Sequence, residues 1–315
     1  MTAPGSPRGA LLWDAIRGEL RRRNYAGRTV TLAEGVVVSA VAGAVAGVTG
    51  GGPRAAATAA VSALGLADDL VEHRQRVAGV PVAKGLRGHL RALRHGRLTT
   101  GGAKAIGIPV VALAAAAADR CHPLAVCRPP SGSAAGHGVP GGAWALAVTA
   151  SGVLLDGALA AGTANLVNLL DLRPGRALKA VAVADVLLAA PFPPGHDAED
   201  SVEAYPRSRS RDGRRLALLT LCLATAALPT DLRERGMLGD VGANTLGFLT
   251  GTAAARRLSP LGRVTALAVV AALVLASEKV SFSAVIDRNS LLRRLDAGGR
   301  RPLPPAPQDP EGASA

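Results

Sequence analysis

The sequence contains few aromatic residues, and this shortage excludes some classes of protein. Phe, Trp and Tyr together make up 2% of the 315 residues. Membrane proteins often place Trp and Tyr in belts at the two bilayer surfaces, and this chain has too few of them to build such belts. The basic segments also lack interleaved aromatic residues that could stack on bases, which argues against nucleic-acid binding.

Cysteines and targeting signals are scarce as well. The three cysteines do not form a metal-binding framework. Cys121 and Cys127 could form a disulfide if their loop faces an oxidising compartment, and two free thiols are an equally good interpretation. No apolar core precedes residue 29, so we expect no cleavable signal peptide.

The abundant residues are small, apolar and basic. Apolar residues make up 49% of the chain, and the formal net charge is +13. The charges occur in blocks between apolar runs, which is typical of membrane proteins. Helices built from Ala, Val, Leu and Gly can pack closely in a bilayer.

We therefore predict an all-α, polytopic integral membrane bundle of about eight transmembrane helices, within a range of eight to ten. Several runs have roughly 15 residues, which is short for a bilayer core about 30 Å thick. The sequence "GGGP" at 50–53 should fold the first two runs into a hairpin. The expected spans are 32–50, 54–68, 104–119, 143–166, 177–191, 214–230, 240–255 and 263–282, and the stretches 127–142 and 191–215 read as loops.

The positions of Lys and Arg predict the orientation. If the N-terminus is cytoplasmic, the segments on that side contain 24 of the 36 Lys and Arg residues, as the positive-inside rule favours. We expect both termini in the cytoplasm. The chain then divides into a basic N-terminal segment (1–31), a membrane domain (32–282) and a C-terminal segment (283–315) whose tail from residue 301 is disordered.

Polar residues form two clusters between residues 64 and 179. Asp68 and Asp69 are expected at the end of the second span, where the partial negative charge of a helix C-terminus disfavours carboxylates. A divalent cation bound with substrate phosphates would relieve this cost, and a solvated pair of boundary acids is the alternative. Asn165, Asn168 and Asp171 are three residues apart and share one helix face, where they could bind a nucleotide, support a metal ion or join two helices.

A third acidic position, Asp240, lies between two glycines in "GDVG" at the start of an apolar helix. It could cap that helix. It could instead bind a metal ion whose other ligands are substrate phosphates, because a helix N-terminus favours anions. In the expected topology all three clusters lie at the cytoplasmic face, which favours a single shared site. A basic loop at 82–105 on the same side could bind lipid head groups or diphosphate, or only anchor the orientation.

The three clusters resemble motifs of the polyprenyl-phosphate N-acetylhexosamine-1-phosphate transferase superfamily, which includes the MraY and WecA types. That superfamily carries Asp-Asp at a helix end, then Asn-x-x-Asn-Leu-x-Asp, then Gly-Asp-x-Gly. Here these motifs read "GLADDL", "NLVNLLD" and "GDVG", and "KGL" at 84–86 resembles a basic motif of the family. The resemblance covers roughly residues 60–255.

The resemblance implies that a polyprenyl phosphate attacks the β-phosphate of a UDP-sugar with Mg²⁺, or Mn²⁺ in its place, and that UMP is released for cell-envelope polysaccharide or peptidoglycan synthesis. It places the active site at the cytoplasmic face of the plasma membrane. It is also compatible with a homodimer. By motif position Asp68 would orient or deprotonate the lipid phosphate, and Asp240 and Asp69 would bind the metal. The implied substrate-binding residues are Lys84, Asn165, Asn168 and Asp171.

Four departures from the family pattern leave the sugar open. Pro174 stands where the MraY type has a second Asp, Glu72 stands in place of a Lys, and Ala243 stands in place of a Ser. The region 277–300 contains no histidine, whereas the family has a His-rich loop there. The alternative is a non-catalytic membrane protein of the same fold that binds prenyl phosphate or an envelope partner.

Asp156 and Asp185 lie within expected spans and outside the motifs. Acids inside a membrane are functional candidates by default. Their neighbours are small or aliphatic, so we expect structural roles in which a single interhelical hydrogen bond satisfies each carboxyl group. The competing interpretation is a transporter that uses both acids.

Overall fold

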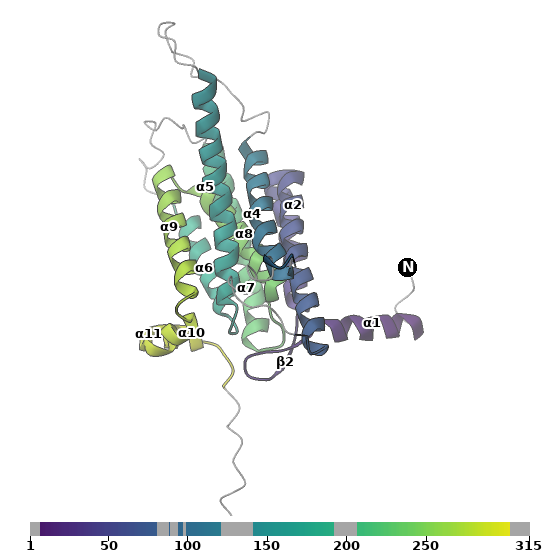
Figure 1. Ribbon diagram of the computed structural model, residues 1–315. Helices are drawn as coiled ribbons and strands as arrows, with labels where there is room; N and C mark the ends of the chain where they lie inside the picture. The colour runs from purple at the N-terminus through teal and green to yellow at the C-terminus, as the bar shows by residue number, and fades with distance from the viewer. Residues whose placement is uncertain are drawn as a thin grey trace, which may run out of the picture.

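The protein is a helical bundle with short elements lying across one end (Figure 1). The computed structural model describes residues 7–80, 88, 94–96, 99–120, 141–191 and 207–302, so Lys84, Cys121 and Cys127 lie outside it. Within these ranges five helices are long and apolar enough to cross a membrane: α2 (Ala33–Val77), α4 (Thr100–Arg120), α5 (Gly141–Leu170), α7 (Arg207–Leu232) and α9 (Pro260–Ser277). This agrees with an all-α membrane protein.

Helix α2 is folded into two arms. Gly51 has φ 69° and ψ −167°, which interrupts the helix, and Pro53 follows. Gly35 near the beginning of α2 and Gly65 near its end both contact the segment 238–241. A straight helix would hold two residues 30 positions apart at about 45 Å, so α2 must turn back on itself. The predicted hairpin is confirmed.

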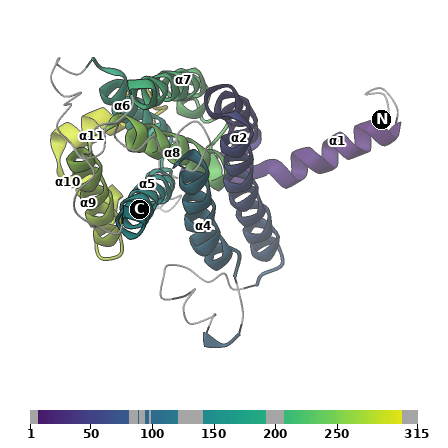
Figure 2. The ribbon, with the colours of Figure 1, turned by 90° about the horizontal axis from the view of Figure 1, so that it is seen from above.

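Helix α8 (Gly239–Arg257) lies in the middle of the bundle, with α2, α5 and α7 around it (Figure 2). Of its 19 residues, 15 are buried. Small residues allow this: the backbone of α5 at Ala160 and Ala164 comes so close to Gly251 and Gly247 that a Cβ atom there would lie 2.7 Å from each Cα. Glycines four residues apart are a common device for close helix packing in membranes. The run predicted as the span 240–255 is therefore a central helix enclosed by protein, and it is not among the five apolar candidates.

The N-terminal segment forms a helix and a small sheet. Helix α1 (Pro7–Leu20) leads into β1 (Arg21–Arg23), which pairs antiparallel with β2 (Thr29–Thr31). The backbone N–H of Met237 donates to the carbonyl of Thr31 at 3.0 Å, so the sheet holds the segment that enters α8.

Two sequence predictions need correction. Asp68 and Asp69 do not end a helix, because α2 continues to Val77 through a polar stretch that carries Arg74 and Arg76 in its last turn, where cations favour a helix C-terminus. The loop predicted to extend to residue 215 gives way to helix α7 at Arg207.

The remaining helices are short. Helix α6 (Arg176–Ala189) lies beside α7, and α10 (Phe282–Arg288) and α11 (Ser290–Ala297) follow α9. With 14 residues, α6 reaches only about 21 Å. Figure 1 shows α10 and α11 across the same end of the bundle as the β-hairpin.

Candidate functional site

The candidate site lies at the N-terminus of α8. The carboxylates of Asp240 and Asp68 both form ion pairs with the ammonium group of Lys104, and Asp68 Oδ2 lies 2.8 Å from Lys104 Nζ. Lys104 is in the first turn of α4, and Thr100 one turn earlier donates a hydrogen bond to Asp68. Three helices thus bring together two carboxylates that are 172 positions apart in the sequence and a lysine between them.

Asp69 binds different groups from Asp68. Its carboxylate accepts hydrogen bonds from the backbone N–H groups of Asp240 and Val241, the second at 3.0 Å. Leu238, the residue in the N-cap position of α8, offers no side-chain cap. Asp69 therefore caps α8 from another helix. The interpretation of Asp240 as the cap is wrong, because its carboxylate faces Lys104 instead.

Asp171 joins this group from the turn that follows α5. Its carboxylate accepts a hydrogen bond from the backbone N–H of Gly239. Burial, and after it the negative charges of Asp231, Asp240 and Asp69, raise the pKa of Asp171 well above its ordinary value. The main cause of the shift is burial, and a cation bound among these groups would act in the opposite direction and lower the pKa of Asp171.

The structure unites most of the residues that the sequence selected. Asp68, Asp69, Asp171 and Asp240 lie together. Along α5, which Asp171 follows directly, Asn165 is exposed and Asn168 is half-buried, and the carbonyl of Asn168 accepts the Asp171 N–H at 3.2 Å. The roles of these two carboxamides stay predictions.

Two basic residues of the site were not selected from the sequence. Lys104 was counted only as part of a basic loop, although a lysine at the first position of an expected apolar span was an available signal. Arg22 of β1 donates from Nη2 to the backbone carbonyl of Asp69 at 2.9 Å. Nothing local in the sequence connects Arg22 with a residue 47 positions away.

A cation fits the chemistry of the site. Carboxylates are preferred ligands of Mg²⁺, which usually also keeps water or substrate phosphates in its coordination shell. Asp68 and Asp240 converge on one cationic atom, so they are placed to share a cation, whereas the carboxylate of Asp69 is engaged at the helix end. Within the described ranges no group of three or more His, Cys, Asp or Glu side chains could hold a metal by itself. A metal bound here would need ligands from a substrate.

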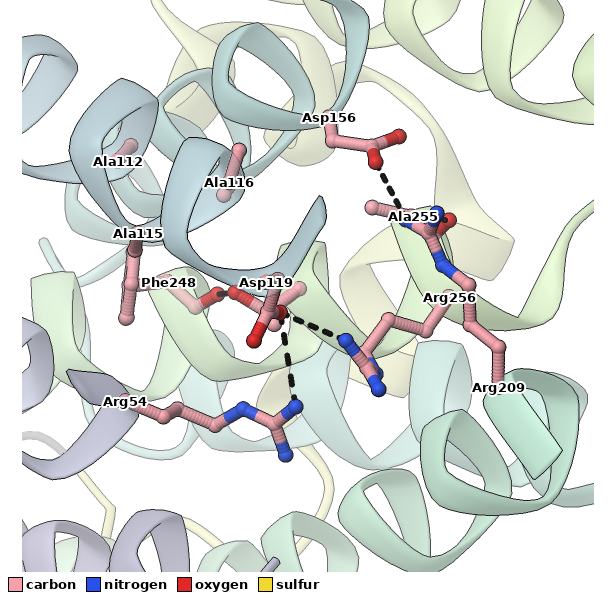
Figure 3. Close-up of a pocket in the computed structure, with 12 residues that line it drawn as sticks. Arg54, Ala112, Ala115, Ala116, Asp119, Asp156, Arg209, Phe248, Ala255 and Arg256 are labelled. Carbon is pink, nitrogen blue, oxygen red and sulfur yellow. Dashed lines mark hydrogen bonds and ion pairs between the residues drawn. The ribbon is translucent and has the colours of Figure 1, made fainter. Parts of the chain in front are cut away.

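A second polar cluster occupies the opposite end of the bundle and contains a small cavity (Figure 3). Asp119 contacts Arg54 at 3.6 Å and Arg256 at 2.7 Å, and Asp156 contacts Arg120 at 2.9 Å and Arg263 at 2.7 Å. Arg256 lies 16 residues after Asp240 on the same helix, or about 24 Å away. The cavity is therefore far from the carboxylates at the α8 N-terminus, and its ion pairs tie neighbouring helices together.

Asp156 and Asp185 are held in different ways, and within the described residues Oδ1 of Asp185 has no hydrogen-bond partner. Asp156 is 4% exposed and is held by Arg120, Arg209 and Arg263, which is more than the single hydrogen bond expected from the sequence. Asp185 is fully buried and accepts one hydrogen bond, from the Thr250 hydroxyl at 3.3 Å. Both arrangements support structural roles.

Comparisons with protein-family models, with curated proteins and with solved structures found no match for this chain.

Proposed function

We propose that the protein transfers a sugar-1-phosphate, most simply an N-acetylhexosamine-1-phosphate, from a UDP-sugar to a polyprenyl phosphate at the cytoplasmic face of the plasma membrane. The observation that carries this proposal is the convergence of Asp68 and Asp240 on one cationic group at the N-terminus of a buried helix. Phosphoryl transfer depends mainly on positioning and on neutralising charge, and both can be supplied by such an arrangement.

In the proposed reaction an oxygen of the polyprenyl phosphate attacks the β-phosphorus of the UDP-sugar. The bond between that phosphorus and the bridging oxygen breaks, and UMP leaves with the bond's electron pair. Asp68 is placed to orient the attacking phosphate or accept its proton, Lys104 to neutralise phosphate oxygens, and Asp171 to approach the nucleotide. The N–H groups at the start of α8 favour anions.

Mg²⁺, held by Asp240 and Asp68 together with the diphosphate, would neutralise charge on the phosphate oxygens. Asp69 contributes by fixing the N-terminus of α8, on which the position of Asp240 depends.

The direct test uses purified protein, Mg²⁺, undecaprenyl phosphate and a panel of UDP-sugars, with UMP release as the readout. Asp240→Asn and Asp68→Asn should each lower turnover by about 100-fold or more, because each removes a preorganised charge. Asp185→Asn, deep in the bundle and outside the site, should keep normal turnover. Full UMP release by the Asp240→Asn variant would refute the proposal.

One observation favours a second function. Lys104 already pairs with both carboxylates and holds them together, so the fold needs no metal at this position. A non-catalytic protein of this fold would bind prenyl phosphate or UDP-sugar without turnover. Binding of either ligand by calorimetry, together with no UMP release for any sugar of the panel, would support that alternative.

A further inference from the structure

Helices α10 and α11 lie at the outer edge of the bundle, beside α6 and α9 (Figure 2). They follow directly after α9, the last of the helices able to cross a membrane. Figure 1 shows them across the direction of the long helices. If α9 crosses the membrane, helices that follow its end and run across its direction lie at the level of the lipid head groups.

Helix α11 is strongly amphipathic, and its apolar side is exposed. Leu291 and Leu295 are one turn apart on one face, with exposures of 64% and 62%, and Leu292 flanks them at 41%. Arg293 is exposed on the opposite side of the helix, and Arg294 is exposed at the border of the leucine face, next to Leu291. An amphipathic helix with leucines on one face and arginines on the other is typical of a segment that lies in a membrane interface.

Helix α11 is attached to the rest of the protein through the side chain of Asp296 and the backbone carbonyls at its C-terminal end. Arg176 Nε and Nη2 donate to the two carboxylate oxygens of Asp296 at 2.8 and 3.0 Å, and both side chains are less than 9% exposed. Lys179 Nζ donates to three backbone carbonyls at the end of α11, those of Leu295, Asp296 and Gly298. The leucine face is thus held in a fixed direction away from the bundle.

These contacts also reach the turn that carries Asp171. Arg300 Nε donates to the carbonyl of Pro174 at 2.8 Å, and Arg173 pairs with Asp287 of α10 at 3.0 Å. Four side chains therefore connect the two terminal helices to residues 173–179, immediately after Asp171. A change in the position of α11 would be transmitted to this turn.

We propose that α10 and α11 form an interfacial platform that lies on anionic lipid head groups, with the leucine face of α11 inserted in the bilayer surface, and that this platform holds the turn carrying Asp171. The exposed apolar surface of α9 continues into the platform through Val280 and Val285, so lipid that surrounds α9 also reaches α11. Exposed arginines at 288, 293 and 294 suit an anionic surface. An eight-residue helix offers too little area for a stable dimer, which buries about 1,200 Å² or more.

The first test measures which medium each face of α11 meets. Nitroxide labels are attached to Leu291→Cys, Leu295→Cys and Arg293→Cys, each in full-length protein with Cys121, Cys127 and Cys222 changed to Ser and reconstituted in phosphatidylcholine vesicles containing phosphatidylglycerol. Labels at 291 and 295 should collide more with lipid-soluble oxygen, and the label at 293 more with a water-soluble nickel chelate. Equal nickel accessibility at all three positions would overturn the proposal. Protection of 291 from both reagents would overturn it too, because it would show that a protein surface covers the face.

The second test concerns the lipid charge. The depth of the label at 291 should decrease when phosphatidylglycerol is omitted, and the double substitution of Arg293→Gln and Arg294→Gln should abolish this dependence. Arg215→Gln, an exposed arginine at the opposite end of the bundle, is the matched control and should preserve it. A depth that does not depend on lipid charge in the parent protein would overturn the anionic part of the proposal.

The third test concerns the attachment to the turn. Leu172 is 59% exposed, next to Asp171, and accepts a label without burying it. Asp296→Asn weakens the pairing with Arg176, so the label at 172 should become more mobile in the vesicles. An unchanged spectrum would show that the platform does not hold the turn. None of the three measurements uses turnover, so they stand apart from the test of the transferase reaction.

Discussion

Asp69 caps a helix to which it does not belong, and this separates it from Asp240. Asp69→Ala removes the acceptor for the first N–H groups of α8 and should lower the free energy of unfolding by about 1 kcal/mol. Asp240→Asn should have little effect on stability, because Lys104 keeps Asp68 as its partner and the substitution relieves repulsion among the carboxylates. Thermal unfolding in detergent compares the two variants. An equal loss in both would contradict the assignment of the cap.

The two buried acids outside the candidate site should also differ when neutralised. Asp156→Asn leaves Arg120, Arg209 and Arg263 without their shared carboxylate, and breaking such a buried arrangement costs about 3 kcal/mol or more. Asp185→Asn keeps an oxygen for the Thr250 hydroxyl and should be nearly neutral. Thermal unfolding midpoints of the two variants provide the measurement. A large loss for Asp185→Asn together with none for Asp156→Asn would reverse the assignment of the structural ion pairs.

At the scale of whole elements, the close packing of α8 against α5 depends on glycines, which have no Cβ atom. A Cβ atom on Gly251 would lie 2.7 Å from the Cα of Ala160, so Gly251→Ala must push α5 and α8 apart and should cost about 1–3 kcal/mol. At Gly43, in the first arm of α2, an added Cβ would meet no atom within 4 Å, and Gly43→Ala should stabilise the helix by about 0.5–1 kcal/mol. Denaturation curves of both variants check the contrast. Similar losses would show that helix packing is looser than these contacts indicate.

The element scale also shows how much could be predicted from the sequence. Apolar runs and the "GGGP" break predict the hairpin and most helix positions, because these depend on local composition. The enclosure of α8 could not be predicted, since a run of small apolar residues looks the same whether lipid or protein surrounds it. The meeting of Asp68 with Asp240 was expected from the motifs, but the lysine between them depends on how α4 packs, which no local pattern records.

For the whole molecule, the attachment of the C-terminal helices gives a dependence on pH. Burial acts to raise the pKa of Asp296, but hydrogen bonds from Arg176 and Arg300 outweigh it and the pKa is lowered. Because the pKa of Asp296 is lower in the attached state, this carboxylate stabilises that state at pH values above its unfolded pKa of about 4. The stabilisation is lost as the pH falls through the folded-state pKa. Limited proteolysis near Arg294 should therefore accelerate only below about pH 4. The Asp296→Asn variant should be cleaved rapidly at every pH. A step in its plot of cleavage rate against pH would show that a group other than Asp296 titrates.

The contact between Lys104 and the two carboxylates has a consequence for the molecule at rest. The ammonium group of Lys104 is a counter-ion that is covalently part of the chain and occupies the position that a free cation would take. A cation entering the site would therefore compete with Lys104 for the carboxylates of Asp68 and Asp240. A lone ion gains little by displacing that ammonium group. An ion that arrives with an anionic ligand offers the lysine a new partner at the same moment, and the exchange then becomes favourable. If the site binds a metal as proposed, the tether would make its occupancy depend on the arrival of the ion together with an anionic ligand.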